Sequence, residues 1–150
     1  MAVQSRLDQS NFSIFLSGNT LSLDNETFLT DAGRTVDLVR GTIVAQVAAT
    51  QKWVPLTNIA ATTGEAIARG IYVGDDIPFA DLVAGDVTGR LVVQGGAAAT
   101  FDKSLVVFEN SLTQDSVVGA ATLAAHTVGD DLAAAGIFLE DTIDIDELEN

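Results

Sequence analysis

The chain has 150 residues, no cysteine and a formal charge of -14, from 21 acidic and seven basic residues. The length suits one domain with one hydrophobic core, and the absence of cysteine excludes disulfides, thiolate zinc sites and cysteine nucleophiles. The negative charge opposes direct binding to nucleic acid or to anionic membranes. Because 47% of the residues are hydrophobic, we expect a folded, β-prone domain rather than a disordered acidic chain.

No segment predicts export or membrane insertion. Residues 1–12 lack the apolar run behind a basic start that marks a signal peptide, and no stretch reaches the roughly 20 apolar residues of a membrane span. We therefore expect a soluble protein that is not exported by that route.

The first 35 residues are rich in Ser, Asn, Asp, Gln and Thr. Residues 12–16 predict one short strand, and the alternation around Leu21 and Leu23 is a weaker strand signal. Two interpretations of this region stay open. It forms edge strands packed on its own domain, or it is an extended arm that orders on another subunit.

From Val36 onward the strand pattern strengthens. Apolar runs at 41–48 and 70–73 indicate short strands, as does the proline-containing piece at 53–56. Between them, the Thr- and Ala-rich residues 57–63 predict a loop. Many short strands separated by turns are typical of an all-β domain.

Residues 86–108 predict a strand, a reversal and a second apolar block. Gly95 and Gly96 can adopt the positive φ angles of a tight turn. The block that follows, at 105–108, is too short to distinguish a strand from a buried helix.

The last third of the chain mixes strand and helix signals. Residues 134–141 resemble 68–75, and both predict the beginning of a strand after a glycine. Residues 116–125 have some helical character, and Asp130 can lead a short helix that Gly136 terminates.

Two acidic motifs are candidates for metal sites, and for each a simpler interpretation is favoured. Residues 72–76, YVGDD, resemble a polymerase metal motif, but a turn with solvated acids is favoured because the chain is small and not basic. The acidic residues 141–149 lack the glycine and the closing glutamate of a calcium loop. We expect no metal and no cofactor.

His126 is the only histidine. A hydrolase that uses it with Asp130 or Asp131 is a weighed alternative, but a surface or satisfied core histidine is favoured. Gly95 and Gly96 lack the spacing of a phosphate-binding loop. We expect no enzyme.

The order of these features resembles the head decoration proteins of tailed bacteriophages, of the lambda decoration protein D type. The similarity covers residues 36–141. It depends on Gly41 before an apolar strand, Trp53 near a proline, Gly70-Ile71 after a small-residue loop, Gly95-Gly96-Ala97 and Gly136-Ile137. The long polar start and acidic end depart from the smaller family members, which leaves open how either terminus engages a shell.

The resemblance implies a mainly β fold with short helices, a small β-tulip-like single domain with an extended N-terminal arm. Residues 1–35 would form the arm and edge segments, 36–142 the β-rich decoration domain and 143–150 an acidic tail. It implies a structural virion protein, made in the host cytoplasm, that binds the outer surface of the expanded capsid. Homotrimers at threefold and quasi-threefold sites would clamp the major capsid protein, without nucleic acid or membrane as a direct partner.

In that family the N-terminal arm commonly lies along the capsid. The candidate capsid-binding residues of this chain are Val3, Arg6, Leu7, Phe12, Ile14 and Phe15. The second interpretation is an adhesive or self-assembling β-domain of a cell-surface or fibre structure.

Overall fold

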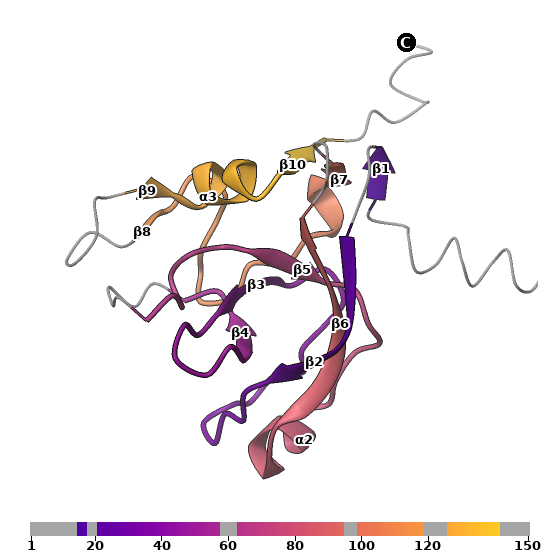
Figure 1. Cartoon of the computed structure of the whole chain (residues 1–150), viewed down its shortest axis with the longest axis vertical. Helices are drawn as coiled ribbons and strands as arrows, with labels where there is room; N and C mark the ends of the chain where they lie inside the picture. Colours follow the sequence, from indigo (N-terminus) through magenta and orange to yellow (C-terminus); the bar gives the residue numbers. More distant parts are fainter. Residues whose placement is uncertain (1–14, 18–20, 58–62, 95–98, 119–125, 142–150) are drawn as a thin grey trace, which may run out of the picture.

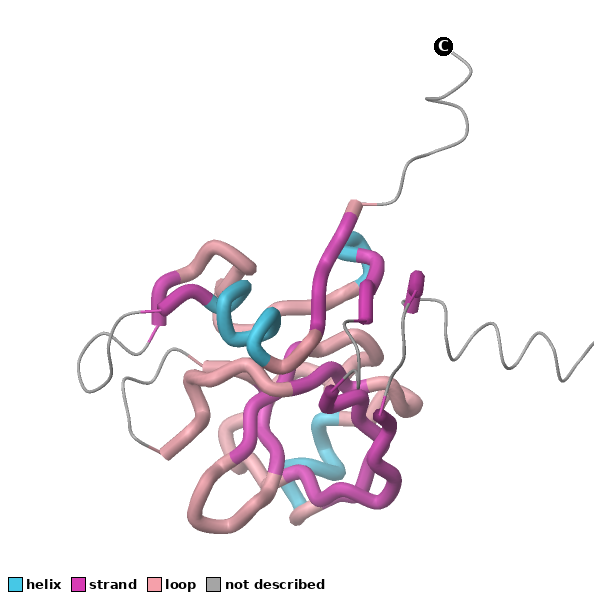
Figure 2. The backbone as a smooth tube through the Cα atoms, turned by 45° about the horizontal axis from the view of Figure 1, so that its top comes forward, coloured by secondary structure: helices cyan, strands magenta, loops and turns pink. Residues whose placement is uncertain are grey.

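Five of the strands close into a barrel in the order β2-β4-β3-β5-β6 (Figure 1). A computed structural model describes residues 15–17, 21–57, 63–94, 99–118 and 126–141 of the chain. The barrel strands are β2 (Leu21–Phe28), β3 (Ile43–Gln46), β4 (Trp53–Pro55), β5 (Gly70–Tyr72) and β6 (Val87–Gln94). Figure 2 shows these strands as a ring, and the chain is mainly strands with few short helices, as expected.

The barrel wall has a hydrophobic core on each side. Side chains alternate across a strand, so Val44 faces the inside while Ile43 and Ala45 face the outside. The inner core includes Phe28 and Tyr72, whose rings meet edge to face with centroids 5.3 Å apart. Its other members are Leu38, Val44, Trp53, Ile77, Leu82 and Leu91. Branched and aromatic residues dominate both cores, which is why these short segments form strands.

The outer core joins the barrel to a second layer. A three-stranded sheet has the order β1-β7-β10, and its strands are β1 (Phe15–Ser17), β7 (Ala99–Asp102) and β10 (Ile137–Glu140). The β8–β9 hairpin pairs Val117–Val118 with His126–Thr127. A 3-10 helix, η1 (Lys103–Leu105), follows β7, and α3 (Val128–Ala134) leads into β10. Phe101, Leu132 and Ile137 are buried against the barrel in this layer.

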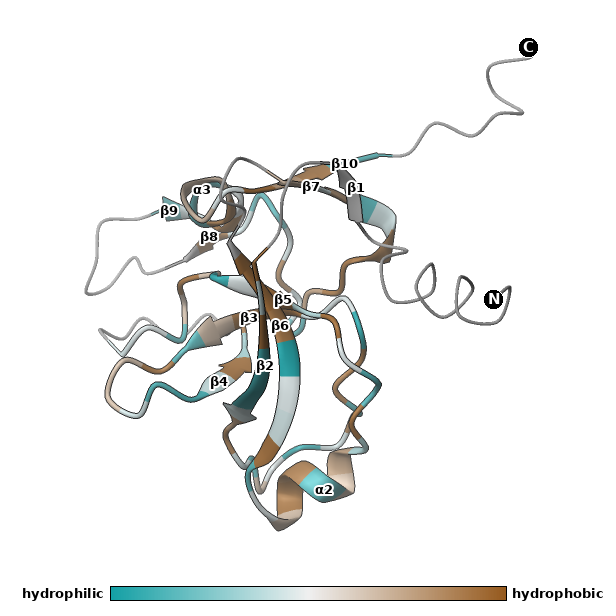
Figure 3. Ribbon diagram, turned by 45° about the vertical axis from the view of Figure 1, so that its right-hand side comes forward, coloured by the Kyte–Doolittle hydropathy of each residue, from teal (hydrophilic) through white to brown (hydrophobic). Residues whose placement is uncertain are grey.

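Helix α2 (Phe79–Ala84) lies at the opposite end of the barrel from the three-stranded sheet (Figure 3). Leu82 is its only buried residue and belongs to the inner core. The carboxylate of Asp37 accepts a hydrogen bond from the Phe79 amide at 2.9 Å. A residue distant in the sequence therefore supplies an acceptor for one of the unpaired N–H groups in the first turn of the helix. Leu82 and Asp37 together fix a helix that is too short to be stable alone.

Strand β2 begins the barrel earlier than the sequence pattern predicts. The sequence pattern places residues 21–28 in the arm or in an edge segment, but β2 pairs with β4 on one side and with β6 on the other. Its pairing register shifts between Leu23 and Glu26, where Asn25 has a φ of 59°. The bulge interrupts the alternation, and the exposed side chains at 22, 24 and 25 are polar, so little apolar pattern remains to be seen.

Several local predictions are confirmed. The runs at 41–48, 53–56 and 70–73 contain β3, β4 and β5, and 137–140 form β10. Helix α3 begins where Thr127 Oγ1 accepts a hydrogen bond from the Asp130 amide, and it ends before Gly136, which has a φ of 77°. These are the cap positions that favour a hydroxyl and a glycine.

Other predictions meet a different structure or lie beyond the part that is described. At 105–108, Leu105 ends η1 and Val107 forms a parallel bridge with Thr42. The helical character of 116–125 is wrong at Val117–Val118, which form β8, because pairing with β9 outweighs a weak local preference. The Gly95-Gly96 turn and the tail at 143–150 lie outside the described residues.

Candidate functional site

The sheet β1-β7-β10 is the place where the first and last described strands of the chain meet. β1 is antiparallel to β7, with Phe15 opposite Phe101, and β10 is parallel to β7, with Ile137 opposite Ala99. β7 is therefore the central strand. In the described part of the chain no strand pairs with the outer edge of β1 or of β10.

One face of this sheet is buried and the other is partly exposed. Ile137 and Phe101 are buried in the outer core, whereas Phe138 is 42% exposed. The alternation of β10 therefore presents an aromatic ring beside an open sheet edge. Unpaired edges of this kind can accept an added strand from another chain.

Local hydrogen bonds fix where β7 ends and where β10 begins. The buried Asp102 carboxylate accepts hydrogen bonds from the amide and the hydroxyl of Ser104, at 3.0 and 2.7 Å, which start η1. The positive φ of Gly136 reverses the chain after α3, and its carbonyl accepts the Ala99 amide at 2.8 Å. Asp102 and Gly136 thus position the sheet.

Of the six candidate capsid-binding residues, the structure places only Phe15, as the first residue of β1. Val3, Arg6, Leu7, Phe12 and Ile14 lie outside the described residues. The segment that carries them enters the sheet through β1, next to the central strand.

His126 Nε2 lies 2.9 Å from Asp131 Oδ2, a contact that is an ion pair when the imidazole is protonated. Burial raises the pKa of the Asp131 carboxyl, while His126 and a hydrogen bond from the Ala68 amide lower it. Because Ala68 precedes β5, this carboxylate connects the β9–α3 segment to the barrel. The two side chains are 19% and 15% exposed, so the contact is largely shielded from solvent.

A histidine–carboxylate pair in a hydrolase needs a nucleophile within hydrogen-bond reach. Of the described residues that line the cavity beside Asp131, none carries a hydroxyl or a thiol. Among the described residues, no group of three His, Asp or Glu side chains is placed to hold a metal ion.

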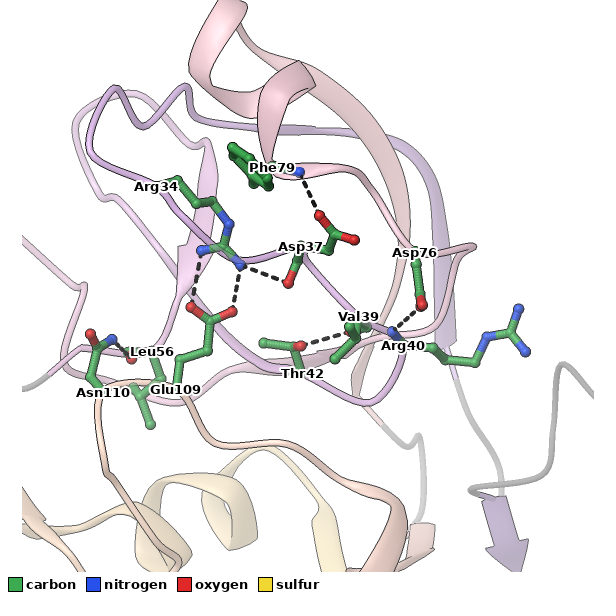
Figure 4. A network of polar contacts seen from close by, with 10 residues as sticks. All are labelled: Arg34, Asp37, Val39, Arg40, Thr42, Leu56, Asp76, Phe79, Glu109 and Asn110. Atoms are coloured by element: carbon green, nitrogen blue, oxygen red, sulfur yellow. Dashed lines mark hydrogen bonds and ion pairs between the residues drawn. The ribbon is translucent and has the colours of Figure 1, made fainter.

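The YVGDD motif forms a turn with solvent-exposed acids, as the sequence predicts. Asp76 accepts a hydrogen bond from the Arg40 amide at 2.9 Å (Figure 4), and Asp75 pairs with the Arg40 guanidinium at 3.1 Å. The Tyr72 hydroxyl donates to the Asp75 carbonyl. Burial, with smaller effects of Asp75 and Asp76, raises the Tyr72 pKa to about 12. These contacts hold the turn against the loop before β3.

Comparison with known proteins adds no family: no protein-family profile matches the chain and no curated protein is similar to it. In the described part of the chain, no helix combines the length and apolar character needed to cross a membrane.

Sequence reasoning missed a cavity of about 490 Å³ at the open end of the barrel. Its lining includes Glu26, Trp53 and Asp131, which come from β2, β4 and α3. The one available signal was Glu26, a charged residue on the inward face of a strand. That signal has meaning only once β2 is known to be part of a barrel.

Proposed function

We propose that this chain is a structural virion protein that binds the outer surface of an expanded phage capsid and stabilises the shell. In this proposal, homotrimers with a β-tulip-like domain occupy threefold and quasi-threefold sites and clamp subunits of the major capsid protein. The sequence resemblance motivates the proposal. One structural observation supports it: the segments 1–14 and 142–150 both continue from the same small sheet, through β1 and β10.

The open sheet edges suggest how binding works. A strand of the capsid protein pairing with an edge, or residues 1–14 pairing with a capsid strand, would supply main-chain hydrogen bonds that need no particular side chain. Fourteen extended residues reach at most about 50 Å, so contacts far from the domain itself are within range of this segment. Val3, Leu7, Phe12, Ile14 and Phe15 supply the apolar contacts.

Arg6 supplies charge complementarity within this segment. It is the only basic residue among the first 33, in a chain of net charge -14. A positive charge placed in an otherwise acidic protein favours contact with an acidic capsid surface and fixes register more than it adds affinity.

Stabilisation of the shell follows from mass action. A protein that binds the expanded lattice and not the dissociated subunits lowers the free energy of the lattice by an amount that increases with its concentration. Joining three such contacts in one trimer raises the apparent affinity without any new kind of contact. No catalytic group is required.

The test uses expanded capsid shells that lack this protein. The purified full chain is added, unbound protein is removed by sedimentation, and the decorated shells are reconstructed by electron microscopy and melted. We expect density for three copies at the threefold positions and a higher melting temperature of the shell.

Shells that bind nothing, or that carry monomers or dimers at these positions, contradict the proposal. The adhesive or self-assembling interpretation predicts instead that the protein forms fibres without shells, which negative-stain images of the protein alone would reveal.

A further inference from the structure

The cavity of about 490 Å³ is the mouth of the barrel at the end away from α2. At the α2 end of the barrel, β2 contributes Phe28 and β6 contributes Val87. At the mouth, β2 contributes Leu23 and β6 contributes Val93. On its other side the mouth is bordered by α3, through Asp131, Ala134 and Ala135. Barrel mouths are common sites for small ligands, with apolar walls and a few polar groups that set specificity.

Glu26 is the acidic group that faces this cavity with the least compensation. Its Oε2 accepts one hydrogen bond, from the Trp53 indole at 3.2 Å. No cationic side chain of the described residues is paired with it. A carboxylate has about four acceptor positions, so an added donor can still be accommodated. Asp131, by contrast, has His126 and the Ala68 amide as partners.

Trp53 gives the site an aromatic wall. The residue is only 3% exposed, it begins β4, and it lies in the inner core next to Phe28. Leu23 and Val93 add aliphatic surface. The indole N–H points at Glu26, so Trp53 contributes apolar surface and one hydrogen bond beside the carboxylate, while attraction for a cation comes from the charge of Glu26.

Arg69 is the opposing feature. It is exposed at the rim of the cavity and takes part in no ion pair among the described residues. A rim guanidinium would favour an anionic ligand instead. The experiment therefore includes a carboxylate with the same number of carbon atoms.

We propose that the barrel mouth binds an ammonium group on an aliphatic stem, with the ammonium at Glu26 and the stem against Trp53, Leu23 and Val93. The source of that chemistry is either a free alkylamine or a lysine side chain of another protein. This site does not depend on the proposed capsid function, and its test needs no capsid.

The full chain is titrated with n-butylammonium chloride, with sodium butyrate and with n-butanol. Trp53 is the only tryptophan, so its fluorescence and its indole N–H resonance report directly on the site. We expect a saturable change with butylammonium that weakens as salt is added, because screening reduces attraction between charges. Binding of butyrate as strong as that of butylammonium, equal binding of n-butanol, or no saturable change overturns the proposal.

Two variants separate charge from shape. Glu26→Gln keeps an acceptor for the indole but removes the negative charge, and it should weaken butylammonium binding at least about tenfold. The matched control is Asp24→Asn, which removes an exposed acid of the same strand that is paired with Arg90, and it should bind as the wild type does. Unchanged affinity in Glu26→Gln contradicts the assignment. If that variant does not fold, the comparison of three ligands and the salt dependence in the wild type decide.

Nα-acetyl-lysine-N-methylamide distinguishes the two sources. Tighter binding of this compound than of butylammonium identifies a lysine of a polypeptide as the ligand, because its backbone amides add contacts at the rim. Weaker binding identifies a free amine. Arg69→Gln should strengthen binding of either ammonium compound, and a wild-type affinity for butyrate that is lost in this variant would show that the site recognises anions.

Discussion

Arg34 holds Glu109 through two hydrogen bonds, from Nη1 to Oε1 at 2.9 Å and from Nη2 to Oε2 at 2.6 Å (Figure 4). The two residues are 75 positions apart, and their side chains are 5% and 17% exposed. Nη2 also donates to the Asp37 carbonyl at 3.3 Å. The pair thus joins the loop that precedes β3 to the segment after η1.

Replacing Arg34 with methionine should destabilise the protein strongly. Glu109 would remain largely buried without a partner, which typically costs about 3–5 kcal/mol of the free energy of unfolding. The control is Arg90→Met: Arg90 pairs with Asp24 at 2.6 Å, but both side chains are more than half exposed, so its loss should cost about 0–1 kcal/mol. Urea unfolding followed by circular dichroism measures both. Equal losses in the two variants would contradict this account.

Gly41→Ala should also destabilise the barrel. Gly41 has a φ of 96°, and a Cβ added there would lie 2.3 Å from the Leu105 carbonyl oxygen. The Gly41 carbonyl accepts the Val107 amide at 2.8 Å, so the two backbones cannot separate without losing that hydrogen bond. We expect a loss of about 2–4 kcal/mol in the free energy of unfolding.

The matched control for Gly41 is Gly85→Ala. Gly85 has extended backbone, with a φ of 172°, and no atom lies within 4 Å of an added Cβ. Its melting temperature should stay within a few degrees of the wild-type value. A Gly41→Ala protein as stable as Gly85→Ala would show that the close approach to Leu105 is relaxed in solution.

Asp131 should give the free energy of unfolding a characteristic pH dependence. Burial raises its pKa above the ordinary value of 3.8, so the folded state binds this proton more tightly than the unfolded state. The contribution to stability is therefore greatest at low pH and is lost as the pH rises through the raised pKa. Asp131→Asn removes this contribution.

We expect the stability of Asp131→Asn relative to the wild type to improve as the pH rises from below the ordinary pKa of 3.8 to above the raised pKa. Urea unfolding at a series of pH values measures this difference. Asp130→Asn, at an exposed position of the same helix, is the control; because the charge of Asp130 adds to the rise of the Asp131 pKa, this variant should reduce the pH dependence only in part. A difference that stays constant or worsens with rising pH would mean that Asp131 is held as a carboxylate by His126 and Ala68.

His126→Ala should leave any capsid-stabilising activity intact. The imidazole contacts Asp131 inside the protein, and the proposed function uses no proton transfer. The variant should lose some stability, because Asp131 keeps only the Ala68 amide. Shell melting with wild type and variant, both at a temperature where circular dichroism shows them folded, is the measurement. Loss of shell stabilisation by a folded variant would indicate that His126 has a functional role.

The strands could be predicted from sequence where the signal is local. β3 and β5 consist mainly of apolar residues between polar or glycine-containing turns, and α3 has a hydroxyl before it and a glycine after it. Such patterns depend on a few neighbouring residues. The expectation of a mainly β single domain with short helices followed from them.

Closure of the barrel and the contents of its mouth could not be predicted in this way. The Glu26–Trp53 hydrogen bond joins residues that are 27 positions apart, and the Arg34–Glu109 pair joins residues that are 75 positions apart. No periodicity in the sequence indicates either contact. The bulge at Asn25 also interrupts the alternation of side chains in β2, so the strand pattern is weak in the sequence. Charged residues that are buried by distant strands look in the sequence like ordinary surface residues.

The N-terminal segment gives the sharpest test of the proposed function. Deleting residues 2–14 leaves β1 and the whole barrel, which begins at Leu21, so the domain should stay folded. Capsid binding should be abolished or greatly weakened, because Phe12 and Ile14 are lost, and a buried apolar side chain contributes about 1.5–3 kcal/mol. Circular dichroism melting and co-sedimentation with expanded shells measure the two effects.

Deletion of residues 143–150 is the control for shortening the chain at the other side of the same sheet, and Phe12→Ser is the corresponding point variant. We expect Phe12→Ser to weaken shell binding while its melting temperature stays close to that of the wild type. If residues 12–16 belong to the domain's own core, Phe12→Ser and the N-terminal deletion will instead melt at a markedly lower temperature. A folded N-terminal deletion that sediments with shells as efficiently as the full chain would exclude residues 2–14 as the capsid contact. The open edges of β1 and β10 would then be the surface to test next, because strand addition there needs no arm.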